Sequence, residues 1–392
     1  MKLFYLTVLD DTDRKKCGIY NKIQGQIDAF IKFNFEVSFC HMHGATEFVI
    51  EEANENKSLN CASGNTRKKL ASVYDPIADY IISNGFENVY IRLTSLDRKA
   101  ISFYKKLKKA NVKIIIEFYS HNLVLERYKT AKRVLRQGKV VDAAKQVISL
   151  TLDSFYFKQL HKYIDLIVTT TPVGDLYGVK TINVVNGINV NGTSVRNKTP
   201  NEFDFNIISV AMISSWHGYD RVIRGISEYY KNGGTINIHY YVIGEGEEKS
   251  DLEKMVASLN LEEHVSFEGI KTGDELNPYY DVADVALEML AGFRRTDGEI
   301  SSIKMAEYFA KGVPVVYSSK RVDAYSDDIN KYSYRLEYDE SIANISEMIS
   351  RITTIYKKDI DTTNSMHSIA GKEFSWKKNM EELIEYITRK GM

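Results

Sequence analysis

The sequence has few cysteines and no excess of charge of either sign, and each shortage argues against a class of protein. Three cysteines occur among 392 residues, Cys17, Cys40 and Cys61, an odd number without C-x-x-C spacing. This argues against a disulfide framework and a zinc site, and it fits a reducing compartment. Lysine and arginine number 52, as do aspartate and glutamate. The overall charge therefore does not indicate a nucleic-acid partner.

Long apolar runs are also absent. The N-terminal run is followed at once by acidic residues; it is too short for the core of a signal peptide and indicates a first buried strand. No stretch approaches the roughly 18 apolar residues that a membrane span needs. We therefore expect a cytoplasmic protein, with peripheral contact at the inner face of the membrane as the one membrane association left open.

What the sequence does contain is a regular alternation of short apolar segments and longer helical patterns. Between the first two apolar segments, residues 18–34 place apolar side chains at the 3.6-residue period of a helix that packs on a sheet. The segments that we predict as parallel strands of the first half are 2–9, 35–42, 88–93, 112–119, 165–171 and 180–185. This is an open α/β pattern.

The pattern breaks and then restarts. Residues 186–206 are rich in Asn, Gly, Thr and charge and lack an apolar period, so we expect a linker at 189–204. Strands are predicted again at 205–212, 236–244, 264–270, 284–290 and 312–318. We therefore predict two Rossmann-like domains facing across a cleft, at 1–188 and 205–372. An amphipathic helix is expected within the terminal segment 373–392.

The stretch Asp297–Val316 is the strongest candidate site. Ser301 or Ser302 can N-cap a helix that runs to about Lys311, with Gly312 as its C′ residue. Open α/β sheets bind ligands where strands turn into helices, so this helix start is a natural place for a ligand.

Lys304 would lie in the first turn of that helix. A lysine there is unfavourable by roughly 0.3–1 kcal/mol, and an anion at the same terminus would reverse the sign. Helix amides, two hydroxyls and one ammonium could together hold a phosphate. On a face turned to the cleft, Glu307 could accept hydrogen bonds from a ribose diol, while Glu299 could meet a sugar. The alternative for all three is an ordinary charged residue on a surface helix.

These residues also carry a resemblance. Glu299 and Glu307 are separated by seven residues and followed by Tyr308, Ala310, Gly312 and the segment 314–316. This pattern resembles the signature of retaining GT-B glycosyltransferases, most closely family four, which includes bacterial capsule and cell-wall polysaccharide enzymes. Further segments that resemble the family in the same order are 184–189, 209–226, 241–270, 277–287 and 374–390. The likeness is specific in the C-terminal half and loose in the N-terminal half.

The resemblance implies transfer of a sugar from a nucleoside diphosphate donor, with retention and with neither metal nor cofactor. Glu307 would hold the ribose, Glu299 the transferred sugar, and Lys304 the leaving diphosphate, whose stabilisation would be the main catalytic contribution. Uridine is the commonest base in similar enzymes, and the acceptor would be a saccharide or a lipid-linked saccharide. The terminal helix would cross back onto the first domain. Further donor-binding residues implied are Ser301, Ser302, Ile303, Arg294, Arg295, Gly244, Gly269, Ile270 and Gly18.

The sequence departs from the family where many members carry two basic residues that grip the diphosphate. Met212 stands in place of the arginine and His217 in place of the lysine. Charge neutralisation would then fall to Lys304, His217 and one or both of Arg294 and Arg295. We expect a protonated His217 beside phosphate, because a neighbouring anion raises an imidazole pKa. The alternative is that His217 is a turn residue.

The first half offers fewer candidates. Gly18 would let the backbone approach a ligand or merely form a turn. His121 follows a predicted strand at its carboxyl end, where family members often carry a histidine that contacts the donor sugar; Glu117, inside that strand, is the other polar candidate. The basic run 127–145 is either a solvated helical face or a patch for anionic lipid.

Two other kinds of protein with the same fold are the alternatives to a glycosyltransferase. A nucleotide-sugar epimerase would need more acid and base residues in the cleft. A non-catalytic partner subunit is favoured by the missing arginine at Met212, whereas Glu299, Lys304 and Glu307 favour an enzyme. A nicotinamide dehydrogenase is set aside because no G-x-G-x-x-G follows the first strand.

Overall fold

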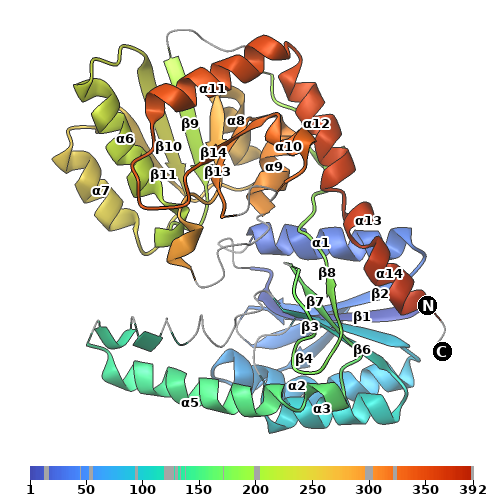
Figure 1. Cartoon of the computed structure of the whole chain (residues 1–392). Helices are drawn as coiled ribbons and strands as arrows, with labels where there is room; N and C mark the ends of the chain where they lie inside the picture. Colours follow the sequence, from blue (N-terminus) through green and yellow to red (C-terminus); the bar gives the residue numbers. More distant parts are fainter. Residues whose placement is uncertain are drawn as a thin grey trace. The chain divides into compact units, whose positions relative to one another are not determined.

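The chain divides into two compact units (Figure 1), each described here by itself. Unit 1 comprises Met1–Val185 and Asn379–Met392, and unit 2 comprises Asn186–Lys378. The computed structural model describes residues 1–12, 17–44, 46–52, 56–92, 96–118, 128, 131–132, 134–136, 138–170, 172–197, 204–295, 303–320 and 325–389.

Among the described residues, unit 1 is built on an eight-stranded sheet with the order β4-β3-β2-β1-β5-β6-β7-β8. The strands are β1 (Lys2–Asp10), β2 (Glu36–His43), β3 (Glu47–Glu51), β4 (Lys57–Asn60), β5 (Asn88–Arg92), β6 (Lys113–Phe118), β7 (Leu166–Thr169) and β8 (Thr181–Asn183). All six strands predicted for this half are present and pair in parallel. The antiparallel strands β3 and β4 were not predicted.

Helices cover both faces of the unit 1 sheet, as an open α/β domain requires. They are α1 (Cys17–Lys32), α2 (Thr66–Ser83), α3 (Arg98–Lys109), α5 (Val140–Phe157), the 3₁₀ turn η2 (Leu160–Lys162) and α14 (Glu381–Thr388). One face packs against α1; the other forms a core with α2, α3 and α5 (Figure 1). The C-terminal helix α14 belongs to this unit, since the Tyr386 hydroxyl donates to the Asp165 carbonyl at 2.9 Å.

In its described part, unit 2 has a six-stranded sheet with the order β11-β10-β9-β12-β13-β14, and every neighbouring pair is parallel. The strands are β9 (Asp204–Val210), β10 (Asn237–Ile243), β11 (Val265–Gly269), β12 (Val285–Leu287), β13 (Val315–Ser318) and β14 (Ser333–Leu336). Five of these were predicted, and β14 was not. Because all six run the same way, their carboxyl ends share one edge of the sheet.

The two faces of this sheet carry separate cores. On one face pack α6 (Tyr219–Lys231), α7 (Lys249–Ser258) and α11 (Ile345–Lys358). On the other pack α8 (Asn277–Val282), α9 (Ile303–Lys311), α10 (Asp327–Asn330) and α12 (Thr362–Glu373). The remaining elements are α13 (Trp376–Asn379), η3 (Val190–Gly192), η4 (Ser215–His217), η5 (Gly273–Leu276) and η6 (Gly292–Arg294).

The described part of the expected linker is packed into unit 2. The Arg196 side chain is 4% exposed, and its Nε donates to the Gly312 carbonyl at 2.9 Å. Its other nitrogens donate to the Ala283 carbonyl and the Tyr356 hydroxyl. This buried arginine joins the segment to α9 and α11, so unit 2 begins before the strand β9 at which we expected the second domain to start.

Within the described ranges, no helix is both long and apolar enough to cross a membrane.

Candidate functional site

The carboxyl edge of the unit 2 sheet is where the loops after successive strands join one another. The amide of Ala211, after β9, donates to Ile243, and that of Gly244, after β10, donates to Gly269. Gly244 has φ +132°, and a Cβ there would lie 1.8 Å from the Ala211 carbonyl oxygen. Only glycine lets these two loops lie so close. The edge is therefore a connected backbone surface rather than a set of independent loops.

Helix α9 begins at this edge and ends as predicted. Its last turn is closed by Gly312, whose φ is +76°, with Gly312 N donating to Phe309 O at 3.0 Å and Val313 N to Tyr308 O at 2.9 Å. These two bonds form the Schellman motif in which a C′ glycine closes a helix. The predicted helix end is confirmed. Glu299, Ser301 and Ser302 lie outside the described residues, so their expected roles stay predictions.

Lys304 lies in the first turn of α9, partly buried, among charged neighbours. Burial lowers its pKa; Glu288 and Glu307 oppose that shift, whereas Arg295 adds to it. The lysine is thus within electrostatic reach of two acids and one arginine. Glu288, directly after β12, was not predicted. Its side chain is 3% exposed, and its Oε1 is buried without a hydrogen-bond partner.

Glu307 is held in place by a tyrosine that sequence reasoning did not single out. The Tyr280 hydroxyl, on α8, donates to Glu307 Oε1 at 2.8 Å, and Tyr280 itself is 1% exposed. Burial raises the pKa of Glu307, while the Tyr280 bond, Lys311 and Lys304 lower it. Glu307 and Lys304 therefore occupy the same face of α9, one turn apart, with a fixed carboxylate and an ammonium close to each other.

His217 is buried in the loop after β9, and its surroundings in the structure lower its pKa. Burial lowers its pKa well below the usual range, and Lys304 and Arg295 lower it further. Its Nδ1 accepts the Ser214 amide at 3.2 Å, and its ring stacks on Tyr219. In the structure as it stands, His217 is therefore a neutral imidazole whose proton is on Nε2. Protonation beside a bound phosphate stays a prediction.

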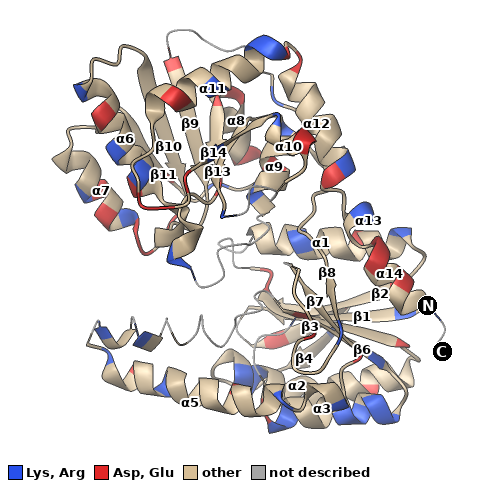
Figure 2. Ribbon diagram, viewed as in Figure 1, with Lys and Arg blue, Asp and Glu red and all other residues tan. Residues whose placement is uncertain are grey.

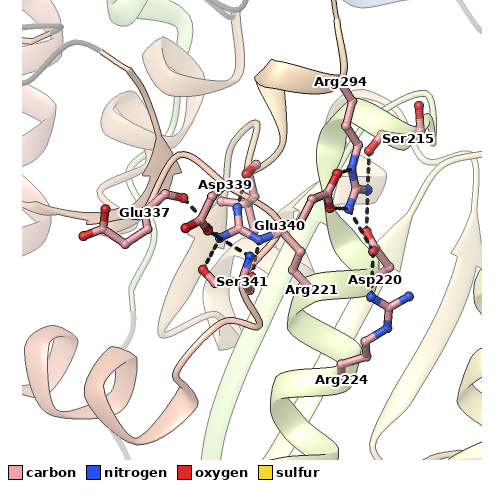
Figure 3. Close-up of polar contacts among 10 residues, drawn as sticks. Ser215, Asp220, Arg221, Arg224, Arg294, Glu337, Asp339, Glu340 and Ser341 are labelled. Carbon is pink, nitrogen blue, oxygen red and sulfur yellow. Dashed lines mark hydrogen bonds and ion pairs between the residues drawn. The ribbon is translucent and has the colours of Figure 1, made fainter.

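Arg294 holds the loop after β12 instead of being left for a ligand (Figure 3). Its Nη1 donates to Asp220 Oδ1 at 2.8 Å and to the Ser215 carbonyl at 2.9 Å, and its Nε donates to Glu340 Oε1 at 3.0 Å. The hydrogen bonds that it donates to Glu340 and Asp220 raise its pKa. The guanidinium is bound by two carboxylates, which gives Arg294 a structural role, and the donor-binding role expected for it stays a prediction.

Arg221, beside it in Figure 3, extends the same brace. It is 1% exposed and donates to the Ser341 carbonyl at 2.6 Å, the Glu337 carbonyl at 3.1 Å and the Leu290 carbonyl. Together the two arginines tie helix α6 to the segment after β12 and to the segment after β14. We call this set, with Asp220 and Glu340, the arginine brace.

The other expected residues of unit 2 lie along this edge. The Arg295 guanidinium lies 5.0 Å from the ring centroid of Trp216 and lowers the pKa of both His217 and Lys304. Met212 is 67% exposed. Gly269 has φ +68°, and both Ile270 and Ile303 are partly buried. The structure thus brings His217, Arg295, Lys304 and Glu307 together and leaves Arg294 out.

The candidate residues of unit 1 are Gly18, Glu117 and His121. Gly18 lies in the first turn of α1 with no atom within 4 Å of an added Cβ, so packing does not demand glycine there. His121 lies outside the described residues. Glu117 is fully buried and paired with Lys22 at 2.6 Å. Across the described residues, no group of three or more His, Cys, Asp or Glu side chains is arranged to hold a metal ion.

Comparisons with known proteins find relatives of part of this chain. A family model described as glycosyl transferases group 1 matches residues 204–352. The amylovoran biosynthesis glycosyltransferase AmsK of Erwinia amylovora is 32% identical over 114 residues, which cover 29% of this chain and 27% of AmsK. The chain thus matches little more than a quarter of the length of that curated relative.

Solved structures match over nearly the whole chain. A sucrose-phosphate synthase from Thermosynechococcus elongatus has a TM-score of 0.64 at 13% identity, covering 98% of both chains. HepE from Anabaena, in complex with UDP and glucose, has a TM-score of 0.58 at 11% identity, covering 99% of both chains. At such identities the likeness establishes the fold alone. Residues 204–352 therefore form a glycosyl transferases group 1 domain, in a chain whose two α/β units have the GT-B fold.

Proposed function

We propose that the protein transfers a sugar, with retention and without a metal, from a nucleoside diphosphate sugar to an acceptor. UDP is the proposed nucleotide and a saccharide or lipid-linked saccharide the proposed acceptor, in bacterial surface polysaccharide or glycoconjugate synthesis. The observation that carries the proposal is the proximity of Lys304 and Glu307, one turn apart on α9 at the carboxyl edge of a group 1 domain, with further charged residues near the lysine. The names of AmsK and HepE support the acceptor class and the nucleotide respectively.

In this proposal Lys304 stabilises the departing diphosphate. Its ammonium is partly desolvated and lies in the first turn of α9, where the helix dipole also favours an anion. A diphosphate beside it would reverse the downward pKa shift that burial causes, so ligand binding and lysine charge reinforce each other. Preorganised charge of this kind is worth most where negative charge develops in the transition state.

Glu307 would hold the ribose through its carboxylate. Tyr280 uses one oxygen of that carboxylate, Oε1, which leaves further lone pairs for the sugar hydroxyls. A neutral His217 with its proton on Nε2 can donate one hydrogen bond to a phosphate oxygen without itself carrying charge. Charge neutralisation then falls on Lys304 and Arg295.

A nucleotide titration tests the proposal. UDP at 100 times its dissociation constant should stabilise the protein by about 2.7 kcal/mol in a thermal-shift series, and a UDP-sugar should be turned over with release of free UDP. Lys304→Ala should weaken UDP binding by roughly 10–100-fold, as expected for a hydrogen bond to a charged group. The control is Lys254→Ala, an exposed lysine of α7 paired with Asp251. No response to any nucleoside diphosphate would contradict the proposal.

Peripheral membrane contact is a second part of the proposal, and α5 supports it. Val141, Ile148 and Phe155 follow one another at seven-residue spacing and are 67%, 62% and 62% exposed. They share one face of the helix, and most of α5 is uncharged in Figure 2. The described basic residues of the run 127–145 precede α5 in the sequence or lie near its start: Lys132, Arg136, Lys139 and Lys145. An exposed apolar stripe next to basic side chains fits the interface of an anionic bilayer.

Vesicle cosedimentation tests the membrane contact. The protein should bind vesicles that contain anionic lipid more strongly than neutral ones, and Ile148→Glu should reduce that binding. Ile360→Glu is the control, since Ile360 is fully exposed in unit 2. Equal binding of both variants, or no dependence on anionic lipid, would remove this part of the proposal and leave the transferase activity untouched.

A further inference from the structure

A buried polar network lies at the carboxyl edge of the unit 1 sheet. Arg92 is the last residue of β5, and it is in register with Glu117 on the neighbouring strand β6. Neighbouring residues in register on parallel strands point to the same face of the sheet. Lys22 and Gln26 reach that face from α1, and Tyr90 lies on it two residues before Arg92.

Glu117 is fully engaged by groups other than Arg92. Its Oε1 accepts Lys22 Nζ at 2.6 Å, and its Oε2 accepts Gln26 Nε2 at 3.2 Å and the Tyr90 hydroxyl at 2.9 Å. Gln26 is held in turn by the Tyr5 hydroxyl at 2.7 Å. The carboxylate is therefore satisfied by one cation and two neutral donors.

Arg92 is left without such partners. Its Nη1 is buried and makes no hydrogen bond, and among the described residues no ion pair within 4 Å reaches its guanidinium. Other arginines of this chain that are buried or partly buried form such bonds. Arg196 and Arg221 each donate to backbone carbonyls, and Arg67 donates to Asp153 at 2.7 Å. An arginine that served only to brace the fold would be expected to show bonds of that kind.

The charges of this network also indicate an anionic partner for Arg92. Lys22 and Arg92 contribute two positive charges against the single negative charge of Glu117. Burial raises the pKa of Glu117, but Lys22, Arg92 and the Tyr90 bond outweigh it and lower that pKa to about 2. The carboxyl thus stays ionised at neutral pH, so the two cations and one carboxylate leave one positive charge in excess, and Arg92, which carries no ion pair among the described residues, is partly buried. Burial and Arg92 both lower the pKa of Lys22, as expected where cations crowd together.

We propose that Arg92, backed by the Lys22–Glu117 pair, forms an anion-binding site at the carboxyl edge of unit 1, which takes a phosphoryl or carboxylate group. An oxyanion there would satisfy the buried Nη1 and balance the second cation, as charge-assisted bonds to guanidinium do. The position is the edge at which open α/β domains bind their ligands. That the anionic group belongs to the acceptor rests on the proposed function, whereas the site itself does not.

The test is a calorimetric titration with inorganic pyrophosphate and, in a second arm, glucuronate, at constant ionic strength and with saturating UDP present. UDP occupies the proposed unit 2 site and so separates it from the unit 1 site. We expect one of the two anions to bind, with the dissociation constant raised at least about tenfold in Arg92→Gln through loss of the charge-assisted bonds. Arg389→Gln, an exposed arginine of the same unit that pairs with Glu385, is the matched control and should bind as the unaltered chain does.

The outcomes distinguish the two proposals. Pyrophosphate binding that depends on Arg92 assigns a phosphoryl group, and glucuronate binding that depends on Arg92 assigns a carboxylate. If neither anion binds, or if Arg92→Gln binds as tightly as Arg389→Gln, the site does not exist. UDP affinity measured on Arg92→Gln should equal that of the unaltered chain, which also shows that the variant folds. If Lys304→Ala no longer binds UDP but still binds the anion, the result supports two separate sites, one in each unit.

Discussion

The hydrogen bond from Tyr280 to Glu307 offers the sharpest single test of the proposed donor site. Tyr280→Phe removes one hydroxyl from a side chain that is 1% exposed and leaves Glu307 Oε1 without its donor. A hydrogen bond to a charged group is worth about 1.5–3 kcal/mol. If Glu307 binds ribose as proposed, losing its anchor should weaken UDP binding by about tenfold, the equivalent of about 1.4 kcal/mol.

Tyr279→Phe is the matched control, because Tyr279 lies next to Tyr280 on α8 and donates to another carboxylate, Glu268 Oε2, at 2.7 Å. Both variants lose the same atom and the same kind of bond. Both should therefore lose folding stability to a similar degree, with a melting temperature lowered by about 2–4 °C for each kcal/mol in a domain of this size. Only Tyr280→Phe should lose UDP affinity in calorimetry.

The pH dependence gives a readout that a loss of folding would not produce. Burial raises the pKa of Glu307, and the Tyr280 bond is one of the causes that lower it. In Tyr280→Phe that pKa rises further, so Glu307 is protonated at a higher pH and accepts fewer hydrogen bonds. UDP affinity should thus fall off on acidification at a higher pH in Tyr280→Phe than in Tyr279→Phe. Identical affinities and pH profiles would refute the assignment of Glu307 to the nucleotide.

Three further predictions concern stability in urea. Arg294→Lys loses the paired bonds to Asp220 and should lower the free energy of unfolding by about 2 kcal/mol. Arg224 is a more exposed arginine that pairs with the same aspartate, and Arg224→Lys should lower it by less than about 0.5 kcal/mol. Equal losses in the two variants would contradict the arginine brace. The folded pKa of His217 lies below its unfolded value of about 6.5, so its contribution to stability is present above that pH and is lost on acidification. From pH 7 to pH 5.5 the unaltered chain should therefore lose about 1 kcal/mol more than His217→Gln, and parallel curves would show that His217 is not buried as a neutral ring. Gly312 has a φ of +76°, and a Cβ there would lie 2.7 Å from the Thr363 backbone, so Gly312→Ala should lower the free energy of unfolding by about 2 kcal/mol or more. Gly233→Ala, where φ is +84° and no atom lies within 4 Å of the added Cβ, should lower it by about 1 kcal/mol. A smaller difference between the two variants would mean that α12 moves to make room for the methyl group.

Sequence reasoning succeeded where a strand is buried on both faces. β1 and β6 are continuous apolar runs, and such runs separated by helical patterns predict a parallel sheet. The strand β4 has four mostly exposed residues at the sheet edge, and β14 is equally short, so neither contains an apolar run to detect. The glycine that ends α9 was predictable because its effect is local to the chain.

The parts of the site that were missed depend on contacts between distant segments. Arg294 lies in the predicted donor loop, but its partners are 74 and 46 residues away, and no local pattern reveals that both are carboxylates aimed at it. Tyr280 lies 27 residues before Glu307. The lowered pKa of His217 in the structure could not be predicted for the same reason, because the desolvation that causes it comes from packing between distant segments.

The arginine brace also limits how this protein could be re-engineered. Arg294 and Arg221 bind residues 215–220, the Leu290 carbonyl and residues 337–341 into one hydrogen-bonded unit. A loop transplanted from a relative in place of residues 290–295 alone would leave Asp220 and Glu340 as two uncompensated carboxylates. A chimera designed to change the proposed donor specificity would therefore have to take all three segments from the same relative. They form one structural unit although they are separate in the sequence.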